Sequence, residues 1–389
     1  MVTDADLVIL GGGCAGLSLA MRLAEQPGSC RRVVVLEARQ HYQNDRTWCF
    51  WQDSCARFDA LVSHRWTQLR VRSAHDSAVV SCAQSPYQLL ESGAFYQKAL
   101  AVLDDHPQIE LHRGVLLTQA PTPLSDGWLV ETPLGVLRAA CLVDTRPGQQ
   151  PVRGEARLWQ SFLGHEVRTD RPVFDPNCVE LMDFAGAGTD TVEFTYVLPL
   201  AVDRALVETT LFDPQPRSAA DLADRQQRAL TRQLHGASAE TIRSEHGILP
   251  MGLSAKRPLS GPRYCAAGLY SGAARPATGY AFQRIQRWAD ACAMTLREGK
   301  GCVGHAADSW LTQAMDDLFL RVLSAEPQLA ADLFVRLFAR VPTPRLIRFL
   351  SDGATLGDRA CVVAALPPLV FLRQLMRTAL LPATRQARA

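Results

Sequence analysis

The sequence lacks a strong charge imbalance and any uninterrupted apolar run long enough to cross a membrane. Its formal net charge is only +2, from 41 basic and 39 acidic residues. Such a balance gives no global field for gathering nucleic acid, so we expect no nucleic-acid partner. The longest apolar run, residues 360–372, carries Pro367 and Pro368 at its centre. Because proline removes backbone hydrogen bonds that a spanning helix needs, we expect no transmembrane anchor.

Paired cysteine motifs are also missing. The 11 cysteines are odd in number and scattered, without a C-x-x-C pair or a histidine spaced to share a metal. They are typical of reduced, mostly buried thiols, and we expect no metal site. The N-terminus, Met-Val-Thr-Asp-Ala-Asp, is acidic, whereas a signal peptide needs a basic start and a cleavable apolar stretch. These features favour a cytoplasmic protein.

At 389 residues and 42.7 kDa, the chain exceeds what one hydrophobic core usually covers, so we expect two or three units around one ligand. The first unit is indicated at the N-terminus. Residues 6–10 form a short apolar run, residues 17–25 have helical apolar spacing, and residues 32–36 are typical of a second buried strand. This order predicts a parallel sheet with a crossover helix, and hence the α/β class.

A glycine motif lies between the first strand and the helix. Gly11, Gly13 and Gly16 satisfy the pattern G-x-G-x-x-G. These glycines let backbone N–H groups approach a pyrophosphate at the positive end of the following helix. The second strand ends at Glu37, whose carboxylate can hold ribose hydroxyls. In this context the motif predicts a dinucleotide site, and the alternative is a purely structural glycine turn.

A later segment favours FAD over NAD as the dinucleotide. Residues 263–272 form a short apolar strand that meets glycines, and residues 276–280 lead into an amphipathic helix over 281–296. The start of such a helix can direct its dipole at the pyrimidine of a flavin. The alternative is an ordinary strand, turn and helix. The cofactor residues expected from this segment are Gly272, Thr278, Gly279 and Tyr280.

The remaining segments alternate between strand and helix patterns. Residues 66–82 predict a hairpin, residues 87–103 a helix, residues 109–141 alternating strands, and residues 160–211 the antiparallel sheet of a second domain. Residues 331–389 are distinct, with nine arginines, three aspartates, and no lysine or glutamate. One interpretation is basic amphipathic helices that lie on an anionic membrane surface, and the other is a helical cap with solvated arginines.

Together these motifs resemble the FAD-dependent lycopene cyclases of bacterial carotenoid pathways, which are relatives of aromatic hydroxylases and geranylgeranyl reductases. The similarity runs in the family's order from about residue 6 to residue 376, and so covers nearly all of the chain. The matching stretches are residues 7–13 (LVILGGG), 45–51 (DRTWCFW), 160–166 (QSFLGHE), 182–184 (MDF), 206–210 (LVETT), 247–250 (GILP), 276–280 (PATGY), 349–350 (FL) and 367–372 (PPLVFL).

The resemblance implies a Rossmann-type FAD-binding domain, an antiparallel β-sheet domain for the substrate, and a helical C-terminal region. The predicted ranges are 1–63, 87–150 and 255–305 for the FAD-binding domain, 64–86 and 151–254 for the substrate domain, and 306–389 for the helical region. It also implies reduced FAD as the active cofactor and NAD(P)H as the electron donor. Arg46 and Asp144 join the expected cofactor residues.

Members of this family close the ends of linear lycopene into β-ionone rings without net redox change. Protonation of the terminal alkene makes a tertiary carbocation, so the enzyme needs a strong acid in a dry pocket. A carboxylic acid keeps its proton in apolar surroundings, and Glu208, flanked by leucines and a valine, is the predicted acid. Glu166 and Asp183 are secondary candidates. The family usually has a second acid where this chain has Thr209, so a changed substrate and weak activity are both open alternatives.

The expected partners are a hydrophobic polyene, an electron donor and a membrane surface. Because a C40 hydrocarbon dissolves only in bilayers, the resemblance favours a peripheral contact of the C-terminal helices with the inner face of the membrane. Two enzyme alternatives share the architecture, an FAD monooxygenase and a reductase of apolar prenyl or polyene chains, and a third is a non-catalytic flavin-bound scaffold or sensor. The expected substrate-lining residues, for which the alternative is ordinary core packing, are Trp48, Phe50, Trp51, Phe162 and Tyr196.

Overall fold

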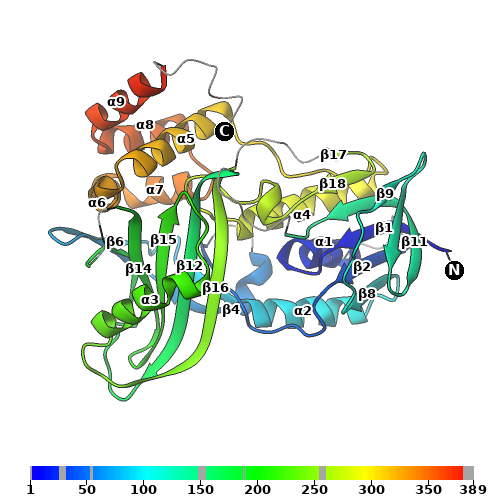
Figure 1. The fold of residues 1–389 in the computed structure, drawn as a ribbon, viewed down its shortest axis with the longest axis horizontal. Helices are drawn as coiled ribbons and strands as arrows, with labels where there is room; N and C mark the ends of the chain where they lie inside the picture. The colour runs from blue at the N-terminus through cyan, green and yellow to red at the C-terminus, as the bar shows by residue number, and fades with distance from the viewer. Residues whose placement is uncertain are drawn as a thin grey trace.

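The computed structural model describes residues 2–25, 32–52, 56–147, 155–186, 188, 190–253 and 260–379. Figure 1 shows two large sheets, with the C-terminal helices gathered at one end of the second. The strands of the first sheet are β1 (Val2–Leu10), β2 (Val33–Glu37), β8 (Ile109–Arg113), β9 (Thr122–Pro123), β10 (Trp128–Thr132), β11 (Gly135–Asp144), β17 (Ser260–Gly261) and β18 (Tyr264–Ala266). Over the described residues their order is β17-β18-β11-β1-β2-β8, with β10 paired to β11 and β9 to β10.

The centre of the first sheet is parallel and buried on both faces. Leu7 on β1 lies opposite Val33 on β2 and opposite Cys141 on β11. Leu7 and Ile9 pack under helices, and Val8 and Leu10 pack on the opposite face. A strand buried on both sides has a continuous apolar run, which the sequence shows here. The helices on the first face are α1 (Cys14–Glu25), α2 (Ser92–Asp104) and α4 (Phe282–Arg297).

The second sheet supplies a wall of the site. Its strands are β5 (Gln68–Arg72), β6 (Ser77–Ser81), β12 (Ala156–Thr169), β13 (Cys178–Asp183), β14 (Val192–Ala201), β15 (Arg204–Asp213) and β16 (Ala239–Leu253). Over the described residues the order is β16-β12-β15-β14-β13-β5-β6, and the pairs are antiparallel except β13 with β5. Helix α3 (Ala219–Gln233) covers one face through Leu222 and Leu230. Residues on the opposite face line the cavity described below.

A small third sheet corrects one prediction. Its strands are β3 (Thr47–Trp51), β4 (Val62–Trp66) and β7 (Tyr87–Glu91), in the order β3-β7-β4. The helix predicted over 87–103 is wrong for its first five residues, because β7 occupies them and α2 starts only at Ser92. Tyr87, Leu89 and Leu90 are buried between two partner strands. Pairing on both sides and burial override the helical tendency of this segment.

The C-terminal region is helical, as predicted. Its helices are α5 (Trp310–Ala325), α6 (Ala330–Arg340), α7 (Thr343–Leu350), α8 (Leu356–Ala365) and α9 (Pro368–Ala379), with short 3-10 turns at η1 (Ala56–Leu61), η2 (Leu269–Ser271) and η3 (Pro327–Leu329) along the chain. Within the described residues, no single helix has the length and apolar composition of a membrane span. Helices α8 and α9 together reach the length and apolar composition of a span, but the pair is bent by 97° at the break between them.

Sheet membership can be compared with the predicted domain ranges. The strands of the first sheet fall within 1–63, 87–150 and 255–305, and those of the second fall within 64–86 and 151–254. Strand β4 crosses the predicted boundary between residues 63 and 64. The division into domains itself stays a prediction.

Candidate functional site

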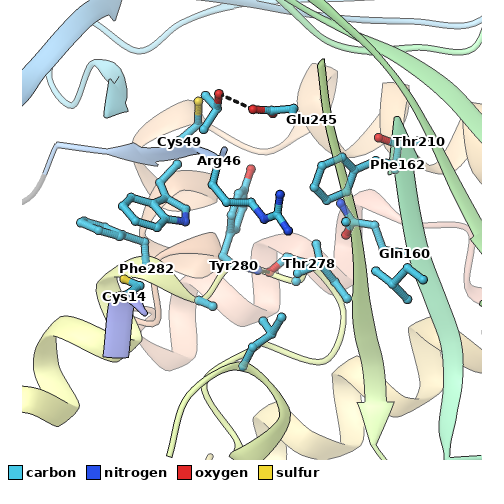
Figure 2. A pocket seen from close by; sticks show the side chains of 18 of the residues that line it. Cys14, Arg46, Cys49, Gln160, Phe162, Thr210, Glu245, Thr278, Tyr280 and Phe282 are labelled. Atoms are coloured by element: carbon cyan, nitrogen blue, oxygen red, sulfur yellow. Dashed lines mark hydrogen bonds between the residues drawn. The ribbon is translucent and has the colours of Figure 1, made fainter. Parts of the chain in front are cut away.

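A cavity of about 700 Å³ lies between the two large sheets and is bordered on one side by α6 and α7. This volume is in the range of about 300–1,000 Å³ that is typical of small-molecule sites. Gly13 at the start of α1 lines one part, strand β15 lines another, and Phe334 and Phe338 of α6 line a third. Figure 2 shows the Arg46 side chain pointing into this space, between Cys49 and Phe162.

The glycine turn at the end of β1 is built as the motif predicts. Gly11 has a left-handed φ of 93°, and a Cβ on Gly16 would collide with the backbone oxygen of Gly11. Glycine meets both demands without strain. The turn places Gly13 on the cavity wall, where the first N–H groups of α1 have no partner within the helix. Such a helix start favours an anion.

Glu37, at the end of β2, is tied to the same turn. Its Oε2 accepts a hydrogen bond from Gly12 N at 2.7 Å, and its Oε1 accepts one from Arg39 N at 2.8 Å. Burial acts to raise the pKa of Glu37, but the hydrogen bonds and charge of Arg39 and the Gly12 N–H outweigh it and lower the pKa below its usual value. Glu37 is therefore an anion held beside the glycine turn.

The other predicted cofactor residues of the first unit are placed differently. Arg46 lines the cavity. Asp144 ends β11 and accepts a hydrogen bond from Arg146 Nη2 at 2.7 Å, while Thr145 and Arg146 themselves reach the cavity wall. Arg39, which the sequence did not single out, also lines the cavity. Its place in the sequence, two residues beyond Glu37 at the end of the second strand, could have marked Arg39 as a cavity residue.

The segment before α4 forms the opposite wall. Gly272 and Gly279 both have left-handed φ values, of 101° and 70°, and Thr278, Gly279 and Tyr280 line the cavity. A Cβ on Gly279 would lie 2.8 Å from Gln160 Oε1, so glycine lets the turn approach β12. Helix α4 begins at Phe282 after an alanine that has no side-chain group to cap it. Its first N–H groups therefore face the cavity region uncapped by their own N-cap residue.

A buried ion pair anchors this wall to the C-terminal helices. Arg275 and Asp316 are each 2% exposed, and Arg275 Nε lies 3.1 Å from Asp316 Oδ2. The Arg275 guanidinium also donates to the backbone oxygen of Phe349 and lies 4.5 Å from the centre of its ring. The three contacts join the turn before α4 to α5 and α7. No local pattern in the sequence pointed to this pairing, because its partners are far apart along the chain.

Glu208 projects from β15 into the cavity. Strand alternation puts it on the same face as Leu206, Thr210 and Phe212, all of which line the cavity. Thr210 Oγ1 donates a hydrogen bond to Glu208 Oε1 at 2.8 Å. Burial, with a contribution from the negative charge of Glu245, raises the pKa of Glu208 to about 8. At neutral pH this carboxyl therefore keeps its proton.

Thr209, where the family usually has a second acid, faces away from the cavity. Its backbone N–H donates to Gln226 Oε1 of α3 at 3.0 Å. The neighbouring residues on that face, Val207 and Leu211, pack against Leu230 and Leu222 of α3. A second acid at this position would lie under α3. The departure from the family pattern therefore leaves the cavity wall unchanged.

Glu245 on β16 is a cavity residue that the sequence reading missed. Arg243 Nη1 lies 2.7 Å from its Oε2, and Thr47 Oγ1 donates to the same oxygen at 2.8 Å. Figure 2 shows Glu245 with this hydrogen bond, across the cavity from Tyr280. The available signal was its place two residues before the GILP stretch that carries part of the family resemblance.

The secondary acid candidates lie outside the cavity lining. Glu166 is 1% exposed, and Arg243 Nε lies 2.6 Å from its Oε2. Asp183 is also 1% exposed, is ion-paired with Arg72, and accepts a hydrogen bond from Gln233 Nε2 at 2.9 Å. Both carboxylates are compensated by cationic partners, in contrast to Glu208. Their catalytic role stays a prediction, to which this placement lends no support.

The predicted aromatic lining divides into two groups. Trp48, Phe162 and Tyr196 line the cavity, whereas Phe50 and Trp51 border a separate void of about 20 Å³ behind it. Phe50 stacks on Phe282 with ring centres 5.0 Å apart, and Trp51 packs edge-on against Tyr280 at 5.4 Å. These two residues support the lining from behind. Tyr87, missed because its segment was read as a helix, also lines the cavity and accepts a hydrogen bond from Tyr196 at 3.0 Å.

Several solved structures share this fold at low sequence identity. A geranylgeranyl bacteriochlorophyll reductase-like protein from Thermoplasma acidophilum is 11% identical, with a TM-score of 0.63 over 96% of this chain and 99% of that one. The p-nitrophenol 4-monooxygenase of Pseudomonas putida DLL-E4 is 18% identical, with a TM-score of 0.57 over 94% and 98%. A variant of the halogenase PltM in complex with FAD is 12% identical, with a TM-score of 0.53 over 92% and 85%. These likenesses confirm the predicted fold class.

A family model described as lycopene cyclase protein matches residues 6–376. No curated protein matches the chain. The family match runs from β1 through the glycine turn, both large sheets and the C-terminal helices, into α9. It confirms the resemblance inferred from the sequence motifs, and the chain belongs to the lycopene cyclase family.

Proposed function

We propose that the protein is an FAD-dependent lycopene β-cyclase, which closes the ends of a linear polyene into rings without net redox change. The observation that carries this proposal is Glu208, a buried carboxyl on the cavity wall whose pKa is raised to about 8. An acid that keeps its proton in a largely apolar cavity meets the first demand of alkene protonation. Membership of the family supports the substrate class.

The residues around one part of the cavity fit FAD. The glycine turn 11–16 and the start of α1 would hold the pyrophosphate, and Glu37 would hold the ribose. Gly279 and the start of α4 would hold the flavin ring. Gln160 Oε1 is buried there without a hydrogen-bond partner among the described residues, and so offers an acceptor to a bound group. When bound, reduced FAD supplies negative charge that stabilises a nearby cation.

Glu208 and Thr210 set the direction of proton transfer. Because Thr210 donates its hydroxyl hydrogen to Oε1, the proton of the Glu208 carboxyl resides on Oε2. Glu208 gives this proton to the terminal double bond, which leaves a tertiary carbocation. The neighbouring double bond attacks the cation and closes the ring. Loss of a proton from the ring to the Glu208 carboxylate restores both the neutral product and the acid.

The cavity walls protect the cation during ring closure. Phe162, Phe194, Tyr196 and Phe212 line the cavity together with Leu206. Aromatic faces attract a cation through their electron density. Apolar walls also exclude water, which would otherwise add a hydroxyl group to the cation. The lining therefore favours an isomer over a hydrated product.

We also propose that α9 contacts the inner face of the membrane. Leu369, Leu372 and Met376 are 74%, 52% and 60% exposed, and their spacing puts them on neighbouring turns of one helix. Arg373 and Arg377 are more than half exposed and lie 3.7 and 3.6 Å from Glu326. An exposed apolar face beside arginines suits a monotopic contact with anionic lipid. Such a contact gives a bilayer-dissolved polyene access to the protein.

The test uses FAD-loaded enzyme in anaerobic liposomes that contain lycopene. Reduction with dithionite replaces NAD(P)H, the proposed electron donor, so the result does not depend on it. A product of unchanged mass with the shorter-wavelength absorption of a ring-closed polyene is expected. Under these anaerobic conditions a product heavier by two hydrogens would identify a reductase. A parallel assay with NAD(P)H and dissolved O2 tests the monooxygenase alternative, which would give a product heavier by one oxygen atom. Unchanged lycopene in both assays, with fully bound and reduced flavin in the anaerobic one, would sink the proposal and leave a flavin-bound scaffold.

A further inference from the structure

Two carboxylates face each other across a glycine on the cavity face of the second sheet. Gly164 on β12 pairs with Glu208 on β15 and with Glu245 on β16. The backbones of the two acids are therefore about 10 Å apart, which is two strand spacings. A Cβ on Gly164 would lie 3.4 Å from Glu208 Cβ and 3.3 Å from Glu245 Cγ. The missing side chain leaves the space between the two acids open.

The two carboxyls are buried to a similar degree but have different partners. Glu208 is 8% exposed and Glu245 is 5% exposed. Glu245 is ion-paired with Arg243 and accepts the Thr47 hydroxyl, so it is held as an anion. The hydrogen-bond partner that the structure describes for Glu208 is the neutral hydroxyl of Thr210. When two neighbouring acids have such different surroundings, the proton is held by the acid that lacks a cationic partner.

The buried cysteine and tyrosines around Glu208 remain neutral over the relevant pH range. Cys49 faces it from β3, and Tyr87, Tyr196 and Tyr280 line the same cavity from other elements. Burial raises the pKa of each of these four groups above its ordinary value. Arg46 also reaches the cavity, but it is exposed to solvent. Glu245 is thus the buried anion that faces Glu208 in this cavity.

We propose that Glu245 is the positioning carboxylate of the site, whose fixed negative charge across Gly164 holds the transferable proton on Glu208. Arg243 forms an ion pair with Glu245 in this arrangement, and Glu166 in turn holds Arg243 from outside the cavity. The inference rests on the proposed role of Glu208 as the acid. It gives the second acid of the site a place on β16, although the family usually has one at position 209.

The decisive variant is Glu245→Gln, which removes the charge and keeps the shape of the side chain. Infrared difference spectra of the FAD-loaded enzyme report the protonated Glu208 carbonyl, identified by its loss in Glu208→Gln. In the native protein this band should persist until the pH rises through about 8. In Glu245→Gln it should disappear at a pH lower by about one unit or more, because the like charge that favours the neutral form is gone. The loss of turnover at high pH should move with it.

Glu193→Gln is the matched control. Glu193 is also a buried, arginine-paired carboxylate of this sheet, but its partner Arg225 belongs to α3 on the opposite face. It should leave the Glu208 band unmoved.

The outcomes separate the inference from the proposed function. A band that disappears near pH 8 in both the native protein and Glu245→Gln overturns the role of Glu245 and leaves Glu208 as the acid. A band that disappears near pH 4 to 5 in the native protein overturns both. A shift in Glu245→Gln that Glu193→Gln reproduces would also overturn the inference, because it would reflect a general loss of charge from the sheet.

Discussion

Two buried glutamates, Glu37 beside the glycine turn and Glu208 on the cavity wall, have opposite charge states. Glu37 and Glu208 are almost equally buried, at 6% and 8% exposure. Glu37 receives backbone N–H groups and Arg39, and its pKa falls despite burial. Glu208 receives a neutral hydroxyl and faces another carboxylate, and its pKa rises to about 8. Burial alone therefore does not decide the charge of a carboxyl, because its hydrogen-bond donors and neighbouring charges do.

The largest effect on turnover is expected for Glu208→Gln. A glutamine keeps the shape of the side chain but has no transferable proton, so turnover with reduced enzyme should fall by about a hundredfold to ten-thousandfold. Product formation in lycopene liposomes measures it. The flavin absorption spectrum and the circular dichroism spectrum should stay unchanged. Full turnover in this variant would contradict the assignment of the acid.

The matching change at the other glutamate is Glu37→Gln. It removes the charge that Arg39 and Gly12 stabilise, and it weakens the proposed contact with the ribose. The affinity for FAD should fall by about tenfold to a hundredfold, from the loss of one or two charge-assisted hydrogen bonds. Fluorescence titration of the apoprotein with FAD measures the change. Turnover at saturating FAD should recover, which distinguishes a binding residue from an acid.

The comparison also predicts a pH dependence of stability. In the unfolded chain Glu208 has the ordinary glutamate pKa of about 4.5, whereas in the folded chain burial raises its pKa to about 8. Between these values the folded state holds the extra proton, so the free energy of unfolding falls as pH rises, by up to about 1.4 kcal/mol per pH unit. Urea unfolding of the native protein and of Glu208→Gln, between pH 5 and 8, measures the difference. Parallel curves for the two proteins would contradict the raised pKa.

The smallest effect is expected at Thr209, beside Glu208 but on the opposite face of β15. Its buried Oγ1 has no hydrogen-bond partner among the described residues. Thr209→Val should therefore leave turnover unchanged and raise the free energy of unfolding by about 1 kcal/mol. Turnover assays and urea unfolding measure the two quantities. A large loss of turnover would show that position 209 influences the acid through the sheet.

The two glutamates also differ in how far the sequence predicted them. Glu37 follows Gly16 by a single helix and strand, and the local order of elements was enough to place both at one turn. The assignment of Glu208 as the acid required a family resemblance. Strand alternation shows which residues share its face of β15, but not which parts of the protein that face contacts. The helix predicted over 87–103 failed at β7 for a related reason: the segment pairs with strands on both sides that lie elsewhere in the chain.

The sequence by itself determined the parallel β1-α1-β2 unit, the glycine turn and the alternation that puts Glu208 and Thr209 on opposite faces, because these depend on neighbours within a helix or a strand. Only the tertiary structure decided which carboxyl keeps a proton. That decision depends on burial in the cavity, on the Glu245 charge across Gly164, and on Arg243, which pairs with that charge. Glu245 and Arg243 both come from β16, a strand distant from β15 in the chain. Charge states follow from three-dimensional surroundings, and no local pattern encodes them.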